Sequence, residues 1–224
     1  MALLDGKTVI VTGAAGALGG GVARVAHSHG ATVELIDVVD GFESELGRTH
    51  TVDLTDADQV GACIASIGRF DGVANIAGGF HMGPAVHETS DEQWDFLFEI
   101  NVKTLRRVMS AAIPVLVAQG SGSIVNVGAL GALSGVGNMG AYTAAKSTVM
   151  RLTEAASDEL RGQGISVNAV LPSLIDTPRN RADMPDADHS AWVSPEALAE
   201  VVCFLLSDRA SAVHGALVPV RGLV

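Results

Sequence analysis

Tyr142 and Lys146 are the residues whose types and spacing most clearly permit proton-transfer chemistry. They stand four positions apart in the segment Tyr-Thr-Ala-Ala-Lys, so on a helix both side chains lie on one face, about one turn apart. An unperturbed tyrosine titrates near ~10, and a neighbouring ammonium favours the tyrosinate. We therefore expect Lys146 to lower the pKa of the phenol so that Tyr142 can exchange a proton near neutral pH. A solvated surface pair would have the same spacing, so a second motif is needed to decide.

A glycine-rich segment near the N-terminus, Thr12–Gly19, indicates where a dinucleotide could bind. It reads Thr-Gly-Ala-Ala-Gly-Ala-Leu-Gly and lies between a predicted strand, Thr8–Thr12, and a predicted helix, Ala17–His29. Glycines permit a tight turn there and let backbone N–H groups approach a pyrophosphate at the positive end of the helix. This loop would place a nicotinamide cofactor beside Tyr142, which is the only tyrosine of the chain.

Asp37 lies eighteen residues beyond Gly19, at the end of the second predicted strand. A carboxylate at that point accepts hydrogen bonds from the adenosine ribose hydroxyls and repels a 2′-phosphate. The glycine loop holds no Lys or Arg, and Val38 follows Asp37, so nothing is placed to neutralise that phosphate. We predict that NADH is preferred over NADPH. A surface Asp at a strand end would explain Asp37 alone, but not the loop and Asp37 together.

Short apolar runs alternate with longer helical patterns along the chain, which predicts βαβ units. We expect a single α/β domain spanning residues 1–224, with a doubly wound, Rossmann-type sheet of seven parallel strands and helices on both faces. The predicted strands are Thr8–Thr12, Thr32–Asp37, Thr49–Asp53, Gly72–Ile76, Ser123–Val127, Ser166–Leu171 and Ala216–Val220. The predicted helices are Ala17–His29, Thr55–Ile67, Asp91–Ala118, Ala141–Gly162 and Pro195–Ser207.

The segment Ser173–Ser194 is predicted to be irregular and is rich in Asp, Pro and Arg. It follows the sixth strand at its C-terminal end, where ligands bind in open α/β sheets. A long irregular segment in a compact domain is usually a lid or simply mobile, and we favour a lid over the substrate. Met184 and Trp192 within it, together with Phe80, are candidates to cover a flat substrate. Trp192 could equally be a hydrophobic plug that pins the lid.

The composition excludes several classes of partner. Hydrophobic residues make up 48% of the chain, and the net charge is −11 with no basic run, so nucleic acid is a poor candidate. Cys63 and Cys203 lie far apart in apolar helical stretches and predict buried free thiols rather than a disulfide or a metal site. No charged region followed by an apolar one precedes the first strand, and no apolar run has membrane-spanning length. We expect a cytoplasmic protein without a metal.

Taken in order, these motifs resemble those of the short-chain dehydrogenase/reductase family over nearly the whole chain. Asp53-Leu54 is similar to the family's adenine-contacting pair, Asn75-Ile-Ala77-Gly78 to its Asn-Asn-Ala-Gly motif, and Asn101 to the helix asparagine of its proton relay. The resemblance implies that Tyr142, Lys146 and Asn101 are catalytic, and that Lys146 also bonds the nicotinamide ribose. The cofactor-binding residues that it implies are Gly13, Ala15, Gly16, Ala17, Leu18, Gly19, Asp37, Val38, Asp53, Leu54, Asn75, Ala77, Gly78, Val127, Tyr142, Lys146, Pro172, Ile175 and Thr177.

The main departure from the family pattern is Ala129, thirteen residues before Tyr142, where the family has its active-site serine. That serine usually hydrogen-bonds the substrate carbonyl oxygen, which alanine cannot do. Ser134 lies only eight residues before Tyr142 and is not expected to substitute for it. The loop also carries Ala17 where most short members have Gly.

One branch of the family, quinonoid dihydropteridine reductase, is similar in its glycine loop and in having alanine at the serine position. The segments Ala77–Phe80 and Asp176–Trp192 of this chain also resemble the corresponding segments of that branch. The branch lacks the asparagine that this chain has at Asn101. The C-terminal helix and the segment Gly215–Gly222 look more like those of ordinary bacterial members of the family.

Chemistry offers a reason why Ala129 could be tolerated. Reduction of a ketone develops charge on one oxygen, whereas a conjugated C=N acceptor spreads it over a ring, so a second oxygen-directed donor matters less. We therefore hypothesise hydride transfer from NADH to a dihydropteridine-like C=N or an activated carbonyl, with Tyr142 as proton donor. The substrate residues would be Phe80, His81, Ala129, Met184 and Trp192, although a loop His such as His81 is often merely solvated.

Two other functions stay open. The chain could be an ordinary bacterial ketoreductase or alcohol dehydrogenase with Ala129 in place of serine, or a non-catalytic NAD(H)-binding protein. Retention of Tyr142, Lys146 and Asn101 argues against the last. The helices Asp91–Ala118 and Ala141–Gly162 carry apolar stripes, and by resemblance they would pack in a homodimer or homotetramer. The stripe residues are Leu97, Ile100, Leu105, Val149 and Leu152.

Overall fold

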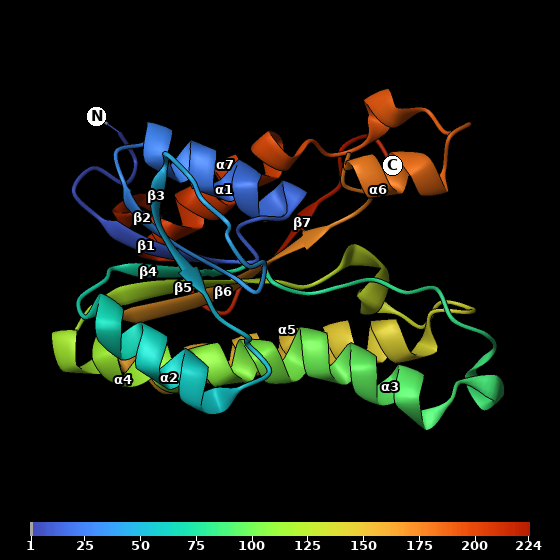
Figure 1. Ribbon diagram of the computed structural model, residues 1–224, viewed down its shortest axis with the longest axis horizontal. Helices are drawn as coiled ribbons and strands as arrows, with labels where there is room; N and C mark the ends of the chain where they lie inside the picture. Colours follow the sequence, from blue (N-terminus) through green and yellow to red (C-terminus); the bar gives the residue numbers. More distant parts are fainter. Residues whose placement is uncertain (1) are drawn as a thin grey trace.

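The inner strands of the central sheet are buried on both faces, whereas the edge strand that begins at Gly47 is polar and partly exposed. In the computed structural model, which describes residues 2–224, seven parallel strands pair in the order β3-β2-β1-β4-β5-β6-β7 (Figure 1). This confirms the predicted sheet. The strands are β1 (Thr8–Thr12), β2 (Thr32–Asp37), β3 (Gly47–Thr51), β4 (Gly72–Asn75), β5 (Gly122–Val127), β6 (Ile165–Pro172) and β7 (Leu217–Val220).

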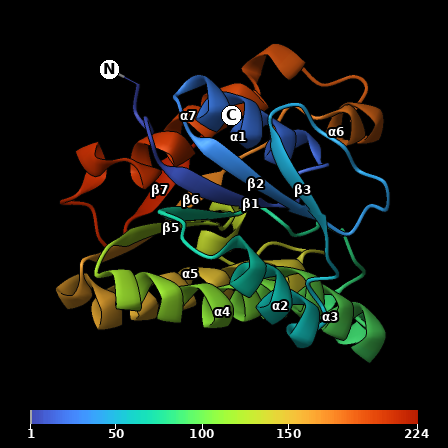
Figure 2. The same ribbon diagram turned by 60° about the vertical axis from the view of Figure 1, so that its left-hand side comes forward.

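Helices cover the two faces of the sheet in two layers, as Figures 1 and 2 show from two directions. One layer holds α1 (Ala17–Ser28) and α7 (Pro195–Leu206), which pack against each other. The other holds α2 (Ala57–Ile67), α4 (Thr104–Gln119) and α5 (Gly140–Leu160). Two further helices are α3 (Asp91–Phe98) and α6 (Pro178–Asp183).

Successive side chains of β1 pack alternately against the two helix layers. Val9 and Val11 belong to the hydrophobic cluster under α1 and α7, whereas Ile10 belongs to the cluster under α2, α4 and α5. All three side chains are fully buried. Because neighbouring side chains of a strand point to opposite faces, a strand covered on both sides must be apolar throughout. This is why the strand reads as a continuous apolar run.

The strand order reverses between β1 and β4, so the loops after these two strands diverge at the C-terminal edge of the sheet. Ligands of open α/β sheets bind in the crevice that such a reversal leaves. Every strand-to-strand connection within residues 2–224 contains a helix except the one from β2 to β3. In that connection Phe42 and Leu46 pack against the α1 side of the core instead.

The third strand was predicted two residues too late. The structure has Gly47–Thr51 rather than Thr49–Asp53. A Cβ at Gly47 would lie 2.0 Å from the backbone oxygen of Val33, so a glycine allows pairing to start there. Asp53 lies beyond the strand, and its carboxylate accepts hydrogen bonds from the backbone N–H and the hydroxyl of Thr55.

The single helix predicted for Asp91–Ala118 is also wrong. A π-helical segment, Glu99–Lys103, separates α3 from α4. Within it, the Asn101 side-chain amide donates to the Leu97 backbone oxygen, four residues earlier, at 3.0 Å. A π-segment inserts an extra residue into a helical turn and is often found at functional sites. The apolar pattern alone could not reveal this insertion.

The segment Ser173–Ser194 is more ordered than predicted. It contains α6 and a 3₁₀ turn, His189–Ala191, and Ile175 forms a parallel bridge with Val193. The Thr177 hydroxyl caps α6 by accepting from the Asn180 N–H at 3.2 Å, and Pro178 occupies the first turn. A threonine cap followed by proline is a recognised start signal for a helix. That signal is present in the sequence and was missed.

Three of the residues assigned to an assembly stripe belong to the core of the chain itself. Leu97, Leu105 and Val149 are at most 5% exposed. Their periodicity therefore reports packing against the sheet rather than a free face.

The prediction of buried free cysteines is confirmed. Cys63 and Cys203 are both buried and unpaired, and burial raises the pKa of the Cys203 thiol to about 12. Within residues 2–224, no helix has the length and apolar character needed to cross a membrane. The same residues contain no cluster of His, Cys, Asp or Glu arranged to hold a metal ion.

Candidate active site

The glycine loop between β1 and α1 leaves the positive end of α1 open. Gly16 is the N-cap residue and offers no side chain to the first-turn N–H groups. Gly13 has a φ of +66°, and a Cβ there would lie 2.9 Å from the backbone of Ala77. A Cβ at Gly19 would lie 2.0 Å from the Gly13 oxygen. The close approach of backbone to backbone therefore requires glycine, and the free N–H groups suit an anionic group such as a pyrophosphate.

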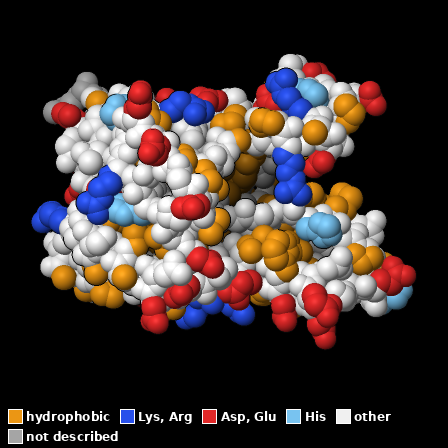
Figure 3. Space-filling model, in the orientation of Figure 1, with side chains coloured by type: hydrophobic (Ala, Val, Ile, Leu, Met, Phe, Trp, Pro, Cys, Tyr) orange, Lys and Arg blue, Asp and Glu red, His pale blue; other side chains and the backbone are white. Residues whose placement is uncertain are grey.

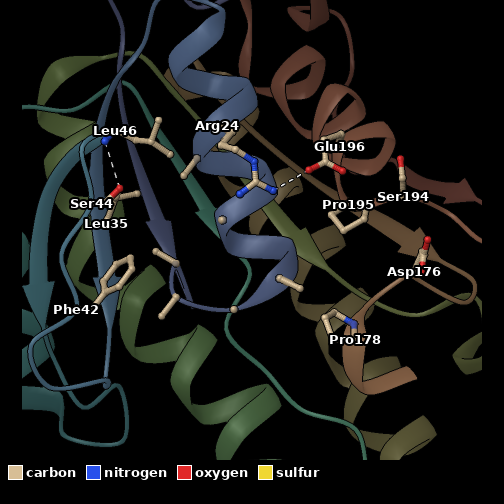
Figure 4. A pocket seen from close by; sticks show the side chains of 16 residues that line it. Arg24, Leu35, Phe42, Ser44, Leu46, Asp176, Pro178, Ser194, Pro195 and Glu196 are labelled. Carbon is tan, nitrogen blue, oxygen red and sulfur yellow. Dashed lines mark hydrogen bonds and ion pairs between the residues drawn. The ribbon is translucent and has the colours of Figure 1, made fainter. Parts of the chain in front are cut away.

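A cavity of about 560 Å³ opens over this helix end (Figure 4). Its floor is the glycine loop, with Phe42 and Leu46 on one side and Asp176, Pro178 and Pro195 on the other. A bridge between α1 and α7, in which Arg24 pairs with Glu196 at 2.7 Å, forms part of its rim. The volume lies within the range of small-molecule sites. The open helix end and the glycine floor fit the pyrophosphate of a dinucleotide.

Asp37 is held against the glycine loop. Its carboxylate accepts hydrogen bonds from the N–H of Ala15 at 2.9 Å and from the N–H of Val39 at 3.1 Å. Val38, the next residue, is 64% exposed. The negative charge is thus fixed beside the loop, with no cation beside it in the sequence.

Thr12 joins the glycine loop to the loop after β4. Its hydroxyl oxygen accepts from the backbone N–H groups of Ile76 and Ala77 at 3.0 and 3.1 Å. Beside it, the Asn75 amide donates to Asn126 at 2.9 Å, and Asn126 donates to the Thr153 hydroxyl at 2.9 Å. These contacts fix the ends of β1, β4 and β5 relative to α5. Asn75 is among the predicted site residues, whereas Thr12, Asn126 and Thr153 are not.

The Asn75 side-chain oxygen is buried and lacks a hydrogen-bond partner among the described residues. Burial without a partner is costly for a polar atom, so such an orphan is a candidate for a water or ligand contact. Asp53 and Leu54, like Asn75, are not among the residues that line the cavity over α1. Leu54 is 8% exposed and packs in the core under α2.

Lys146 is buried at the end of β5. Its ammonium donates to the backbone oxygen of Val127 at 2.9 Å, and the side chain is 6% exposed. Burial lowers the pKa of Lys146 to about 8 because an ammonium loses its hydration there. The expected cofactor-binding residues Val127 and Lys146 thus meet directly.

Tyr142 lies one turn before Lys146 on α5 and packs edge-on against Phe80, with ring centroids 4.9 Å apart and planes at 89°. Burial raises the pKa of Tyr142 to about 12. The expectation that Lys146 lowers this pKa is therefore wrong for the chain without a cofactor. The cause is loss of hydration at the phenol, which the Lys146 ammonium, bonded to the Val127 oxygen, does not offset.

Asn101 and Gly78 bring the π-segment up to Lys146. The Asn101 side chain accepts from the Gly79 N–H at 3.1 Å and donates to the Gly79 oxygen at 3.0 Å. A Cβ at Gly78 would lie 2.7 Å from the Asn101 side-chain oxygen and 3.3 Å from the Lys146 ammonium. All three predicted catalytic residues, Tyr142, Lys146 and Asn101, therefore converge beside the loop after β4.

Ala129 lies where a serine would face Tyr142. It is 7% exposed and belongs to a small apolar cluster with Ala132, Met150 and Leu171, against which Tyr142 packs. No hydroxyl replaces the missing one at this position of the chain. The phenol thus has apolar neighbours on this side.

The predicted substrate residues divide into two groups. Phe80 contacts Tyr142, and His81 lines a crevice of about 10 Å³ together with Tyr142 and Asn138, room for about one water molecule. Trp192, in contrast, is 7% exposed and packs on His189, with ring centroids 4.4 Å apart. In this structure Trp192 is an internal plug of the lid rather than an exposed substrate contact.

The remaining lid residues build the lid itself. Met184 is partly buried, and its backbone oxygen lies 2.9 Å from the imidazole of His189. Asp176 forms a two-pronged ion pair with Arg181, whose guanidinium holds the pKa of that carboxyl below its ordinary value. Pro172 ends β6, Ile175 forms the bridge to Val193, and Thr177 caps α6.

Three comparisons relate this chain to known proteins. The family model described as enoyl-(acyl carrier protein) reductase matches residues 13–222. Short chain dehydrogenase adrF of Penicillium rubens is 31% identical over 250 residues, which cover 98% of this chain and 97% of that protein.

Solved structures agree over almost the whole chain. Carveol dehydrogenase from Mycobacterium avium in complex with NAD has a TM-score of 0.90 at 26% identity, covering 99% of this chain and 98% of that chain. A structure from Beutenbergia cavernae, described as an NAD(P)-dependent gluconate 5-dehydrogenase with bound NADP, has a TM-score of 0.89 at 29% identity, covering 98% and 96%. Similar structures therefore hold either nicotinamide dinucleotide.

A glycine of the loop and one outside it yield a matched pair of variants. In Gly19→Ala the new methyl group would collide with the Gly13 carbonyl, so we expect NADH binding to weaken by about tenfold or more. In Gly61→Ala, on α2 and outside the cavity, no atom lies within 4 Å of the new methyl group. We expect unchanged NADH affinity and a slightly more stable α2 because alanine favours helices. Fluorescence titration and urea unfolding measure both; equal NADH affinity in the two variants would contradict the assigned role of Gly19.

Burial of Lys146 predicts an alkaline gain in stability. The folded-state pKa of about 8 lies below the model value of 10.5, so as pH rises above 8 the unfolded chain holds more protons than the folded one. This difference contributes on the order of 1–2 kcal/mol to the free energy of unfolding between about pH 8 and 9.5. The buried thiols of Cys63 and Cys203 oppose it over the same range, and Tyr142 opposes it above about pH 10, because burial raises their pKa values and their unfolded forms ionise first. Urea unfolding at each pH tests this.

Lys146→Met is the control for the alkaline gain. This variant removes the titrating lysine but keeps both thiols and Tyr142, so the difference in free energy of unfolding between wild type and variant should rise by on the order of 1–2 kcal/mol between about pH 8 and 9.5. A difference that stays constant over this range would show that Lys146 is not the titrating group.

Proposed function

This chain belongs to the short-chain dehydrogenase/reductase family and is an NAD(P)-dependent oxidoreductase, and we propose that it uses NADH to reduce a conjugated C=N or an activated carbonyl. The observation that carries the proposal is a phenol held protonated by burial, with alanine at the neighbouring donor position. Tyr142 is protonated at neutral pH, and the anion that hydride transfer leaves on the acceptor nitrogen or oxygen is basic enough to take this proton even from a phenol with a pKa of about 12. That property suits a proton donor in a reduction.

The proposed roles follow from the contacts. A bound NADH supplies the hydride. Tyr142 gives its phenolic proton to the reduced acceptor, and Phe80 limits where that acceptor can lie by packing against the tyrosine ring. Lys146 holds its ammonium at the end of β5, where the resemblance has it bond the nicotinamide ribose, and Asn101 fixes the Gly79 backbone beside it.

The nature of the acceptor is inferred from Ala129. A simple ketone concentrates charge on one oxygen during reduction and gains from two donors, whereas a conjugated acceptor delocalises that charge. Because Tyr142 is the one hydroxyl donor of the site, a conjugated acceptor suits it better than a simple ketone. The lid and loop motifs favour a dihydropteridine-like ring as that acceptor.

NADH is the proposed cofactor because Asp37 is fixed at the glycine loop with no cation beside it. The remaining proposals concern the setting of the enzyme. The free thiols of Cys63 and Cys203 support a reducing compartment such as the cytoplasm. Exposed aromatic side chains on α3, Trp94 and Phe96, support a homodimer or homotetramer, and a light-scattering mass would establish which.

A second function is an ordinary alcohol dehydrogenase or ketoreductase that tolerates Ala129. It is favoured by the similarity to carveol dehydrogenase, which is named for an alcohol. Broad activity on simple alcohols and ketones in both directions would support it.

A screen of NADH oxidation tests the proposed reaction directly. The acceptors would be quinonoid dihydropterin, imines, activated carbonyls and simple ketones. We expect turnover of the conjugated or activated acceptors, and in Tyr142→Phe a loss of kcat of at least about a hundredfold with NADH affinity retained. A Tyr142→Phe enzyme with wild-type kcat would remove the proposed proton donor.

Asp37→Asn tests the cofactor preference. The variant keeps an acceptor oxygen but loses the negative charge, so the ratio of Kd values should shift toward NADPH by about tenfold. The matched control is Asp40→Asn, which removes an equal charge from an exposed position in the following loop. If both variants shift the ratio equally, net charge rather than Asp37 sets the preference.

A further inference from the structure

Two loops form the walls beside Tyr142. One follows β4 and runs through residues 78–89; the other follows β5 and runs through residues 128–139. They are joined by a hydrogen bond from the Gly83 N–H to the Asn138 oxygen at 2.8 Å. Val86 of the first loop packs on the start of α5, since a Cβ at Gly140 would lie 2.9 Å from its side chain. The walls are therefore fixed relative to the phenol.

These walls expose large apolar side chains to solvent. The exposed fractions of the five are 38% for Phe80, 59% for Met82, 71% for Val86, 59% for Leu133 and 39% for Val136. Figure 3 shows hydrophobic side chains gathered on this face, below the hollow between the two halves of the molecule. Apolar side chains clustered at a site, rather than scattered singly, indicate a surface that binds an apolar group.

The same walls carry no permanent cation. The sequence has no Lys or Arg between Arg69 and Lys103, nor between Arg107 and Lys146. Lys146 itself is buried against Val127. The titratable groups of the first loop are His81, His87 and Glu88, and the second loop has none.

Of the two arginines of the lid, Arg181 is held by Asp176 in the two-pronged ion pair, whereas Arg179 is exposed and lies 3.8 Å from Asp183. A carboxylate or phosphate on a substrate is normally held by an Arg or Lys beside it. The two wall loops themselves offer no such residue.

From these observations we propose that the acceptor is an uncharged molecule with an apolar body that lies between the two wall loops. The proposal rests on the proposed reductase function and narrows its substrate class. It excludes substrates recognised through a carboxylate, a phosphate or a phosphopantetheine group. Selectivity against such substrates comes from the cost of bringing a charge to a surface that offers it no partner.

A matched pair of acceptors tests this in the whole protein with NADH. The pair is 1-phenyl-1,2-propanedione and its para-carboxylate derivative, which share the reacting dione and differ in a remote charge. At about pH 8, where imidazole side chains are ordinarily neutral, we expect kcat/KM to be at least about tenfold higher for the neutral compound. Equal values for the two compounds would overturn the proposal.

A charge placed on the wall should reverse the discrimination. Leu133→Arg adds a guanidinium at an exposed wall position, and we expect kcat/KM for the carboxylate to rise about tenfold relative to the neutral compound. Phe204→Arg on α7, 40% exposed, changes the net charge equally, away from the walls, and should leave the ratio unchanged. An equal effect of both variants would mean that overall charge, not the wall, selects the substrate.

A binding measurement distinguishes failure of the proposed substrate class from failure of the proposed reductase function. Saturation-transfer NMR with the same two compounds, in the presence of NAD⁺, reports binding whether or not turnover occurs. Binding of the neutral compound alone without turnover would uphold the wall proposal while the reductase proposal fails. Turnover with equal binding of both compounds, or binding of neither, would overturn the wall proposal.

Discussion

The site depends on the loss of hydration at two neighbouring titratable groups on α5. Burial shifts both toward their neutral forms: the pKa of Lys146 falls to about 8, while that of Tyr142 rises to about 12. Lys146 is still mostly protonated at neutral pH, but its presence does not offset the loss of hydration at the phenol. The chain alone thus holds a protonated phenol that is a weak acid, and the electrostatics that draw the proton out must come with cofactor and substrate.

Glycines and buried amides hold this arrangement in place. Gly78 lets Asn101 and Lys146 come together, because any side chain there would occupy the space of both. Thr12 ties the end of β1 to the backbone after β4, and Asn126 joins β4, β5 and α5 through its amide. Hydrogen bonds in a low-dielectric interior hold these elements in one geometry, and the Asn75 oxygen is left without a partner among the described residues. The precision of the site therefore comes from backbone proximity more than from hydrophobic packing.

Much of this could be predicted from the sequence, and the failures have identifiable causes. The strand β1 was predicted to the residue because a strand buried on both faces shows a continuous apolar run, and the bounds of β2 were also predicted correctly although Glu34 interrupts its apolar run. The convergence of Tyr142, Lys146 and Asn101 followed from motifs of known order. The π-segment was missed because one inserted residue barely disturbs an apolar pattern, and α6 because its Thr177-Pro178 signal was overlooked.

Other failures lie beyond any sequence pattern. Periodicity could not tell whether Leu97, Leu105 and Val149 face the core or a partner, since both uses give the same spacing. Spacing likewise placed Lys146 beside Tyr142 but could not weigh attraction against the loss of hydration. That balance depends on burial, which only the folded chain reveals.

Direct titration of Tyr142 tests the central claim most sharply, because a single tyrosine makes the tyrosinate absorbance unambiguous. The account predicts a phenol that stays protonated up to about pH 10 in the chain alone and ionises at a clearly lower pH once NAD⁺ is bound. A phenol that titrates near ~10, as a free tyrosine does, with or without NAD⁺ would contradict it.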